Sequence, residues 1–162
     1  MEEELYNGKI VIINDTIIKA PNSDGIKEAG FKILSLGDSY TIGQRICEKY
    51  SFPPQLLDSL LEETAKKSKF GLKIIERIGW TTSNLIEAIN LENFTSDYNF
   101  VTLLIGINNQ NKSFNIYEAE FPLLVNRTIS FVPGDPSKLV VLSIPDYEFI
   151  PFRNGNTAIS GG

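Results

Sequence analysis

The most consequential absence in this chain of 162 residues is histidine, which occurs at no position. Histidine is the usual general base at physiological pH and the commonest metal ligand in proteins. A serine hydroxyl is a poor nucleophile until a base removes its proton. Any serine chemistry in this sequence therefore lacks its ordinary partner.

Cysteine is nearly absent as well, with Cys47 as the single instance. One cysteine excludes an internal disulfide and a cage of thiolates around a metal. A zinc site would have to rely on carboxylates alone, which is unusual for that ion. The sequence predicts neither a metal nor a cofactor, and we expect Cys47 to be an ordinary half-buried thiol.

Positive charge and long apolar runs are also scarce. The net charge is −5 and the pI is about 4.8, which argues against nucleic acid and anionic membranes as partners. The short basic run at Lys66-Lys67-Ser68-Lys69 is typical of a solvated helix end. No run approaches the ~20 apolar residues of a membrane span. Met1-Glu2-Glu3-Glu4 is acidic where a secretory signal is basic, so a cytoplasmic location is expected unless a leader precedes these residues.

What the sequence does contain is a series of short aliphatic runs that alternate with helical patterns. Each run is almost continuously apolar, as in parallel strands that are covered on both faces. The runs are Lys32–Leu36, Leu72–Ile78, Phe100–Ile105 and Lys138–Ile144. With 42% hydrophobic residues, the chain suits one α/β domain with a parallel sheet.

The segments between these runs predict helices. Ser51 can cap a helix that has Pro53 at its start, and Thr81 or Thr82 can cap the next one. The third pattern, from Tyr117 to Ile129, contains Pro122, which must kink the helix or start a second piece of it.

Residues 1–30 differ from the rest. The β-branched runs Lys9–Ile13 and Thr16–Lys19 flank Asn14-Asp15, which predicts a hairpin or an extended arm. We therefore divide the chain into an N-terminal arm, 1–30, and a main domain, 31–162.

Parallel sheets of this kind place their chemistry just beyond the carboxyl ends of the strands. We call the residues that directly follow a strand the exit of that strand. Three of the four predicted exits begin with glycine, which lets the backbone turn sharply and expose its N–H. The exits read Gly37-Asp38-Ser39, Gly79-Trp80-Thr81, Gly106-Ile107-Asn108-Asn109 and Pro145-Asp146-Tyr147.

Three blocks of sequence, "LSLGDSYTIG", "ERIGWTTSNL" and "LLIGINNQ", together resemble the SGNH hydrolases, also called GDSL esterases and lipases. The resemblance covers roughly residues 31 to 152 and implies a three-layer, flavodoxin-like fold. It implies that Ser39 is the nucleophile. It also implies an oxyanion hole made of the Ser39 and Gly79 backbone N–H groups and the Asn108 amide. The substrate would be a lipid, a simple carboxylic ester or an O-acetylated sugar.

Each of these residues also has a structural interpretation. Ser39 could cap a helix, and Asp38 could bond within its turn rather than act as an acid or contact substrate. Gly79 could only permit a turn, and Asn108 could be an ordinary loop residue. Trp80 could line a substrate pocket or pack against the sheet.

Asn109 and Gln110, which follow Asn108, are interpreted as polar loop residues.

The base of SGNH enzymes is a histidine in a late Asp-x-x-His block, which this sequence lacks. Its end, "EFIPFRNGNTAISGG", predicts neither a further helix nor a fifth strand. We therefore expect either truncation after the fourth strand or a degenerate protein. Removing a triad base lowers turnover on the order of a million-fold, and Asp146 is too weak a base to substitute. The chain alone is expected to be inactive or nearly so.

Two other functions stay open. The chain could be a non-catalytic module that binds acyl groups or carbohydrate. It could also be a phosphate-binding or magnesium-dependent domain that uses Asp38 and Asp146, although no glycine-rich phosphate loop follows the first run. A missing fifth strand would leave a sheet edge open and favour self-association.

Overall fold

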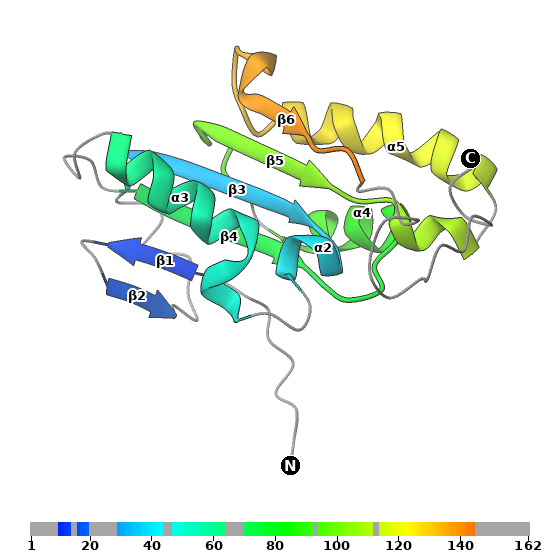
Figure 1. Ribbon diagram of the computed structural model, residues 1–162. Helices are drawn as coiled ribbons and strands as arrows, with labels where there is room; N and C mark the ends of the chain where they lie inside the picture. The colour runs from blue at the N-terminus through cyan, green and yellow to red at the C-terminus, as the bar shows by residue number, and fades with distance from the viewer. Residues whose placement is uncertain are drawn as a thin grey trace.

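The computed structural model describes residues 10–13, 16–19, 29–43, 47–63, 70–92, 94–111 and 114–144. Its main feature is a parallel sheet in the order β4-β3-β5-β6 (Figure 1). The strands are β3 (Phe31–Gly37), β4 (Phe70–Glu76), β5 (Phe100–Leu104) and β6 (Leu139–Val141). The prediction of a parallel sheet is confirmed.

The strands form where the aliphatic runs predict them, with small differences at the ends. In β4 every residue from Phe70 to Ile75 is buried, as expected of a strand that is covered on both faces. The last strand is shorter than the predicted Lys138–Ile144. Lys138 instead ends the 3₁₀ turn η3 (Pro136–Lys138), whose proline and Asp135 cap favour a helical turn over an extended strand.

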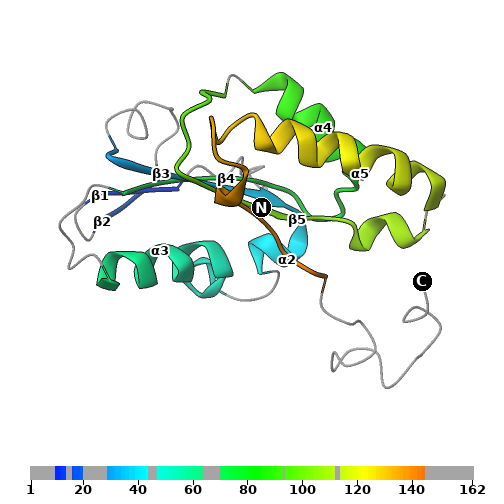
Figure 2. The same cartoon turned by 90° about the horizontal axis from the view of Figure 1, so that it is seen from above.

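Helices cover both faces of the sheet and make three layers (Figure 2). One face carries α2 (Ser39–Ile42) and α3 (Phe52–Glu63). The other carries α4 (Thr82–Leu91) and α5 (Phe114–Ile129). The predicted three-layer α/β fold is confirmed, and α5 continues through Pro122 without a break.

Each face has its own apolar core. On the α3 side, buried residues from β3, β4 and the helix form a small cluster: Ile33, Leu57, Phe70, Leu72 and Ile74. The larger cluster on the opposite face includes Leu34, Leu36, Leu85, Ile89, Leu103 and Leu124. Successive residues of β3 thus enter opposite cores, which fixes the register of the central strand.

The N-terminal region contains β1 (Ile10–Ile13) and β2 (Thr16–Lys19), which pair antiparallel. The predicted hairpin is confirmed for these residues, and β1 lies alongside β4 (Figure 1). The division into an arm and a main domain stays a prediction. The run Lys66-Lys67-Ser68-Lys69 lies outside the described residues.

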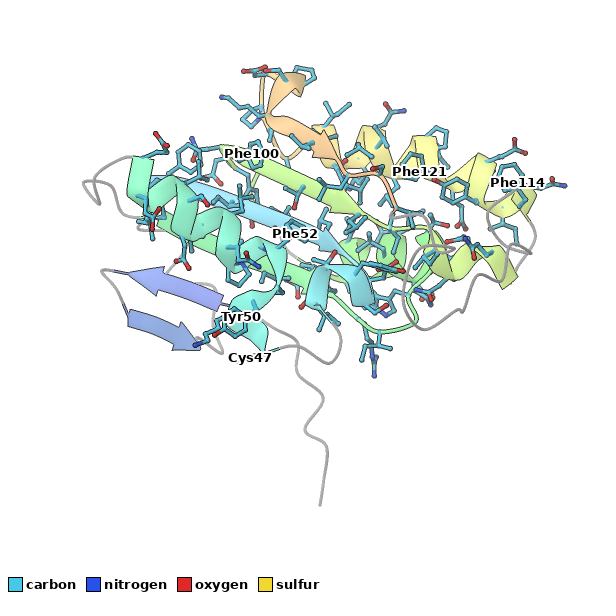
Figure 3. The ribbon with its side chains drawn as sticks, in the orientation of Figure 1. Cys47, Tyr50, Phe52, Phe100, Phe114 and Phe121 are labelled. Carbon is cyan, nitrogen blue, oxygen red and sulfur yellow. The ribbon has the colours of Figure 1, made fainter. Side chains whose placement is uncertain are left out.

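Cys47 is exposed, so the expectation of a half-buried thiol is wrong. It lies in the connection just before the 3₁₀ turn η1 (Glu48–Tyr50), at the surface of the molecule (Figure 3). No helix in the described parts of the chain has the length and apolarity to cross a membrane.

Candidate functional site

The sheet brings three strand exits together at its carboxyl edge. β3 pairs in parallel with both β4 and β5, and Gly37 lies opposite Glu76 on one side and Leu104 on the other. The segments that leave these strands therefore begin side by side. They carry Ser39, Gly79 and Asn108, the three residues that sequence reasoning singled out.

The β3 exit is a tight turn that leads directly into a short helix. Asp38 is the N-cap of α2, and its Oδ1 accepts a hydrogen bond from the Tyr40 N–H at 2.9 Å. Ser39 is the first residue of the helix and is half-buried. Among the described residues, no hydrogen bond of its hydroxyl is found.

Asp38 itself is buried, with 1% of its surface exposed. Burial raises the pKa of its carboxyl to about 6, while the backbone N–H groups of Tyr40 and Gly106 lower the pKa in part. Its Oδ2 forms no well-aligned hydrogen bond within the described part of the chain. The observed role is therefore that of a helix cap, and a contact with substrate stays a prediction.

Gly37 is required at this exit because there is no space for a side chain. A Cβ at this position would lie 2.0 Å from Thr41 Oγ1 and 2.3 Å from the backbone oxygen of Leu104. Thr41 of α2 and the backbone oxygen of Leu104 can each approach this position so closely only because it is a glycine.

The β4 exit contains Gly79, which has a φ of 80°. This left-handed conformation favours glycine, although a Cβ would meet no atom within 4 Å. Gly79 is exposed. The neighbouring Trp80 is half-buried and packs against the larger core, as one of its two interpretations requires.

The β5 exit begins with buried Gly106 and continues into the 3₁₀ turn η2 (Ile107–Asn111). Asn108 is half-buried, and its Nδ2 donates to the backbone oxygen of Trp80 at 2.8 Å. An amide nitrogen carries two hydrogens, so this bond leaves one N–H of Asn108 for a ligand. The same bond ties the β5 exit to the β4 exit.

Asn109 is not a polar loop residue, and that interpretation was wrong. It is buried, its Oδ1 accepts from the Thr82 N–H at 3.1 Å, and its Nδ2 donates to Thr82 Oγ1 at 2.9 Å. These bonds fasten the β5 exit to the first turn of α4. Gln110 is exposed, as its loop interpretation requires.

The first turn of α4 is held by its own sequence as well. Thr81 precedes the helix as its N-cap, and Asn84 Oδ1 accepts from the Thr81 N–H at 3.1 Å. The predicted cap is therefore confirmed at Thr81. Asp146, the second carboxylate of the magnesium alternative, lies outside the described residues.

Comparison with known proteins finds relatives at the level of structure. No family model and no curated protein matches the chain. Among solved structures, the esterase AlinE4 of the SGNH-hydrolase family superposes with a TM-score of 0.56 at 15% identity, over 70% of this chain and 59% of that one. Axe2, an acetylxylan esterase from Geobacillus stearothermophilus, gives 0.53 at 20% identity, over 78% and 66%.

A third neighbour is LAE5, an alpha/beta hydrolase from the metagenome of Lake Arreo in Spain. It gives a TM-score of 0.51 at 22% identity, over 70% of this chain and 60% of that one. The chain thus spans about 60% of the length of LAE5 and AlinE4. At these identities the comparison concerns the fold, and it confirms the expectation from the three sequence blocks: the described part of this chain has an SGNH-hydrolase-like fold.

Proposed function

We propose that this chain forms the nucleophile and oxyanion half of an SGNH-type ester hydrolase. Ser39 Oγ attacks the carbonyl carbon of an ester while a base takes the hydroxyl proton. The tetrahedral intermediate then breaks its bond to the ester's alkoxy oxygen, which leaves as the alcohol after it takes that proton, and an acyl-serine remains. The backbone N–H groups of Ser39 and Gly79 and the second side-chain N–H of Asn108 donate hydrogen bonds to the oxyanion. The observation that carries the proposal is the pairing of β3 with both β4 and β5, which sets these three exits next to one another.

The chemistry requires donors that are fixed before the reaction begins. The carbonyl oxygen gains a full negative charge in the tetrahedral intermediate, and each preorganised donor is worth about 10²–10³-fold in turnover. The bond from Asn108 to Trp80 supports the proposal on this point, because it holds the amide in one orientation in the free protein.

The general base is the part that these residues do not supply, since the 162 residues include no histidine. The proposal therefore requires a base from outside this set, and the chain by itself should turn over esters very slowly. Esters of small acyl groups, acetyl above all, are the substrate class we propose. AlinE4 is an esterase, and Axe2 is an acetylxylan esterase.

The test supplies the missing base. The chain is incubated with p-nitrophenyl acetate with and without added imidazole, and acetylation is mapped to individual residues by peptide mass spectrometry. We expect imidazole to accelerate acetylation of Ser39, and Asn108→Ala to slow it about 10²-fold. Ser59, an exposed serine on α3, is the internal control and should show only background acetylation.

Acetylation of Ser39 no faster than that of Ser59 would refute the proposal. The binding-module alternative gains only if this outcome is accompanied by saturable binding of an acetylated ligand to the unmodified chain. Equilibrium dialysis with an acetylated xylo-oligosaccharide measures that binding directly.

A further inference from the structure

A second group of side chains lies behind the β5 exit, on the side of α4 and α5. It consists of Asn109, Thr82, Ser83 and Glu120. Glu120 is in the middle of α5, and its carboxylate accepts from the Thr82 hydroxyl through Oε2. The Ser83 hydroxyl is 2.7 Å from Glu120 Oε1 and 2.8 Å from Oε2.

The carboxylate fixes the direction of every bond in this group. An ionised carboxylate only accepts, so the single proton of the Thr82 hydroxyl must point to Glu120. The lone pairs of the same hydroxyl then face Asn109, whose Nδ2 donates to it at 2.9 Å. The Asn109 amide is thereby locked with Oδ1 toward the Thr82 N–H at 3.1 Å.

Burial makes this chain of bonds more than a surface contact. Thr82 is fully buried and Asn109 is 4% exposed, so an unpaired polar atom in either of them would be costly. Glu120 also lies at the N-terminal turn of α4, where a negative charge is favourable. Three side chains, Glu120, Thr82 and Asn109, thus join α5, α4 and the β5 exit.

We propose that Glu120 and Thr82 are positioning residues for the Asn108 amide, an inference that rests on the proposed function. The bonds of Asn109 to Thr82 hold η2 against α4. Because Asn108 is the neighbouring residue of the same turn, its amide stays in place to donate to the Trp80 carbonyl. Without the Thr82 hydroxyl, Asn109 loses its fixed orientation and the turn that carries Asn108 loosens. Glu120 touches no reacting atom and acts only through Thr82 and Asn109.

Two measurements on the full chain test this inference. The first is the rate of imidazole-assisted acetylation of Ser39 by p-nitrophenyl acetate. Thr82→Val and Glu120→Ala should each lower that rate about tenfold, the size expected for one charge-assisted hydrogen bond. Thr82→Ser, which keeps the hydroxyl, should restore it. Ser83→Ala is the matched control, because it removes the bifurcated hydrogen bond to the same carboxylate and leaves the Thr82–Asn109 link intact.

A double-mutant cycle separates positioning from a general loss of structure. In the Asn108→Ala background, Thr82→Val should have no further effect on the rate, because the amide that it positions is gone. An undiminished tenfold effect in that background, or an equal loss in Ser83→Ala, would overturn the inference.

The second measurement does not depend on catalysis. Nitrogen-15 NMR follows the side-chain amide signals of Asn108 and Asn109 in the free protein. We expect both to shift in Thr82→Val and Glu120→Ala and to stay in place in Ser83→Ala. If Ser39 is never acetylated, the proposed function fails and this measurement decides the inference alone. Unchanged Asn108 signals in Thr82→Val would refute it.

Discussion

The exits of β3 and β5 lie next to each other at one edge of the sheet, yet they are built in different ways. The β5 exit is held by hydrogen bonds to neighbouring segments, because Asn108 bonds to Trp80 and Asn109 bonds to Thr82. The β3 exit is held by close packing at Gly37 and by the cap of Asp38. There the buried Asp38 Oδ2 and Thr41 Oγ1 form no well-aligned hydrogen bond with any described residue.

This difference separates two requirements of serine catalysis. Donors for an oxyanion have to be rigid in advance, and the β5 exit has the hydrogen bonds for that. A nucleophile needs a base, and none of the 162 residues is a histidine. If the proposed function holds, these residues supply all the oxyanion donors, but they do not supply a base for the Ser39 nucleophile. The two exits can therefore be tested separately.

The largest effect concerns turnover. Without a base, hydrolysis of p-nitrophenyl acetate by the chain should fall on the order of a million-fold below that of a complete triad. Steady-state release of p-nitrophenol should therefore be the same for the unaltered chain and for Ser39→Ala. Turnover that Ser39→Ala removes would show that the β3 exit has a base of its own.

Gly37→Ala should have the largest effect on stability at the β3 exit. Its Cβ would collide with Thr41 Oγ1 and with a backbone oxygen that cannot rotate away. We expect a loss of about 3 kcal/mol in the free energy of unfolding, measured by urea titration. Gly79→Ala is the matched control, because its Cβ would contact no other atom. It should lower the free energy of unfolding only through the strain of a positive φ, by about 1 kcal/mol. Equal losses in both variants would contradict the close packing described for Gly37.

Asn108→Ala should affect the chemistry of the β5 exit more than its stability. We expect the free energy of unfolding to fall by about 1 kcal/mol, since one neutral hydrogen bond to Trp80 is lost. The slower acetylation of Ser39, about 10²-fold, should exceed what this destabilisation explains. Urea titration and the acetylation assay on the same protein preparation measure both. A large loss of stability with unchanged acetylation would assign Asn108 a structural role only.

The smallest effect is a pH dependence at the β3 exit. The pKa of Asp38 is raised from 3.8 to about 6 by burial, so the folded state favours the protonated carboxyl. Its stabilising contribution is complete below the unfolded value and is lost as the pH rises through about 6. Between about pH 7 and about pH 5, the chain should gain on the order of 1 kcal/mol relative to Asp38→Asn. Parallel pH profiles of the two proteins would exclude this shift.

The sequence predicted the parts of the site that depend on local pattern. Continuous aliphatic runs marked the strands, and the residues after them identified Ser39, Gly79 and Asn108 as candidates. The Thr81 cap was also readable, because a threonine directly before an apolar helical pattern is a local signal.

The partners of these residues were not predictable from the sequence. Asn109 looks like any loop asparagine until the fold sets it against Thr82. Glu120 is far from Thr82 in sequence and lies on a helix whose pattern shows only which face is apolar. Such contacts are decided by how α4 and α5 pack, and no short-range spacing encodes that.

The most direct test is a crystal structure of the chain with a small alkylboronic acid bound to Ser39 Oγ, since the tetrahedral boronate imitates the acylation intermediate. We expect one boronate oxygen to lie about 2.7–3.1 Å from both the Asn108 Nδ2 and the Gly79 nitrogen. An adduct whose oxygens reach neither donor and point into solvent would contradict it.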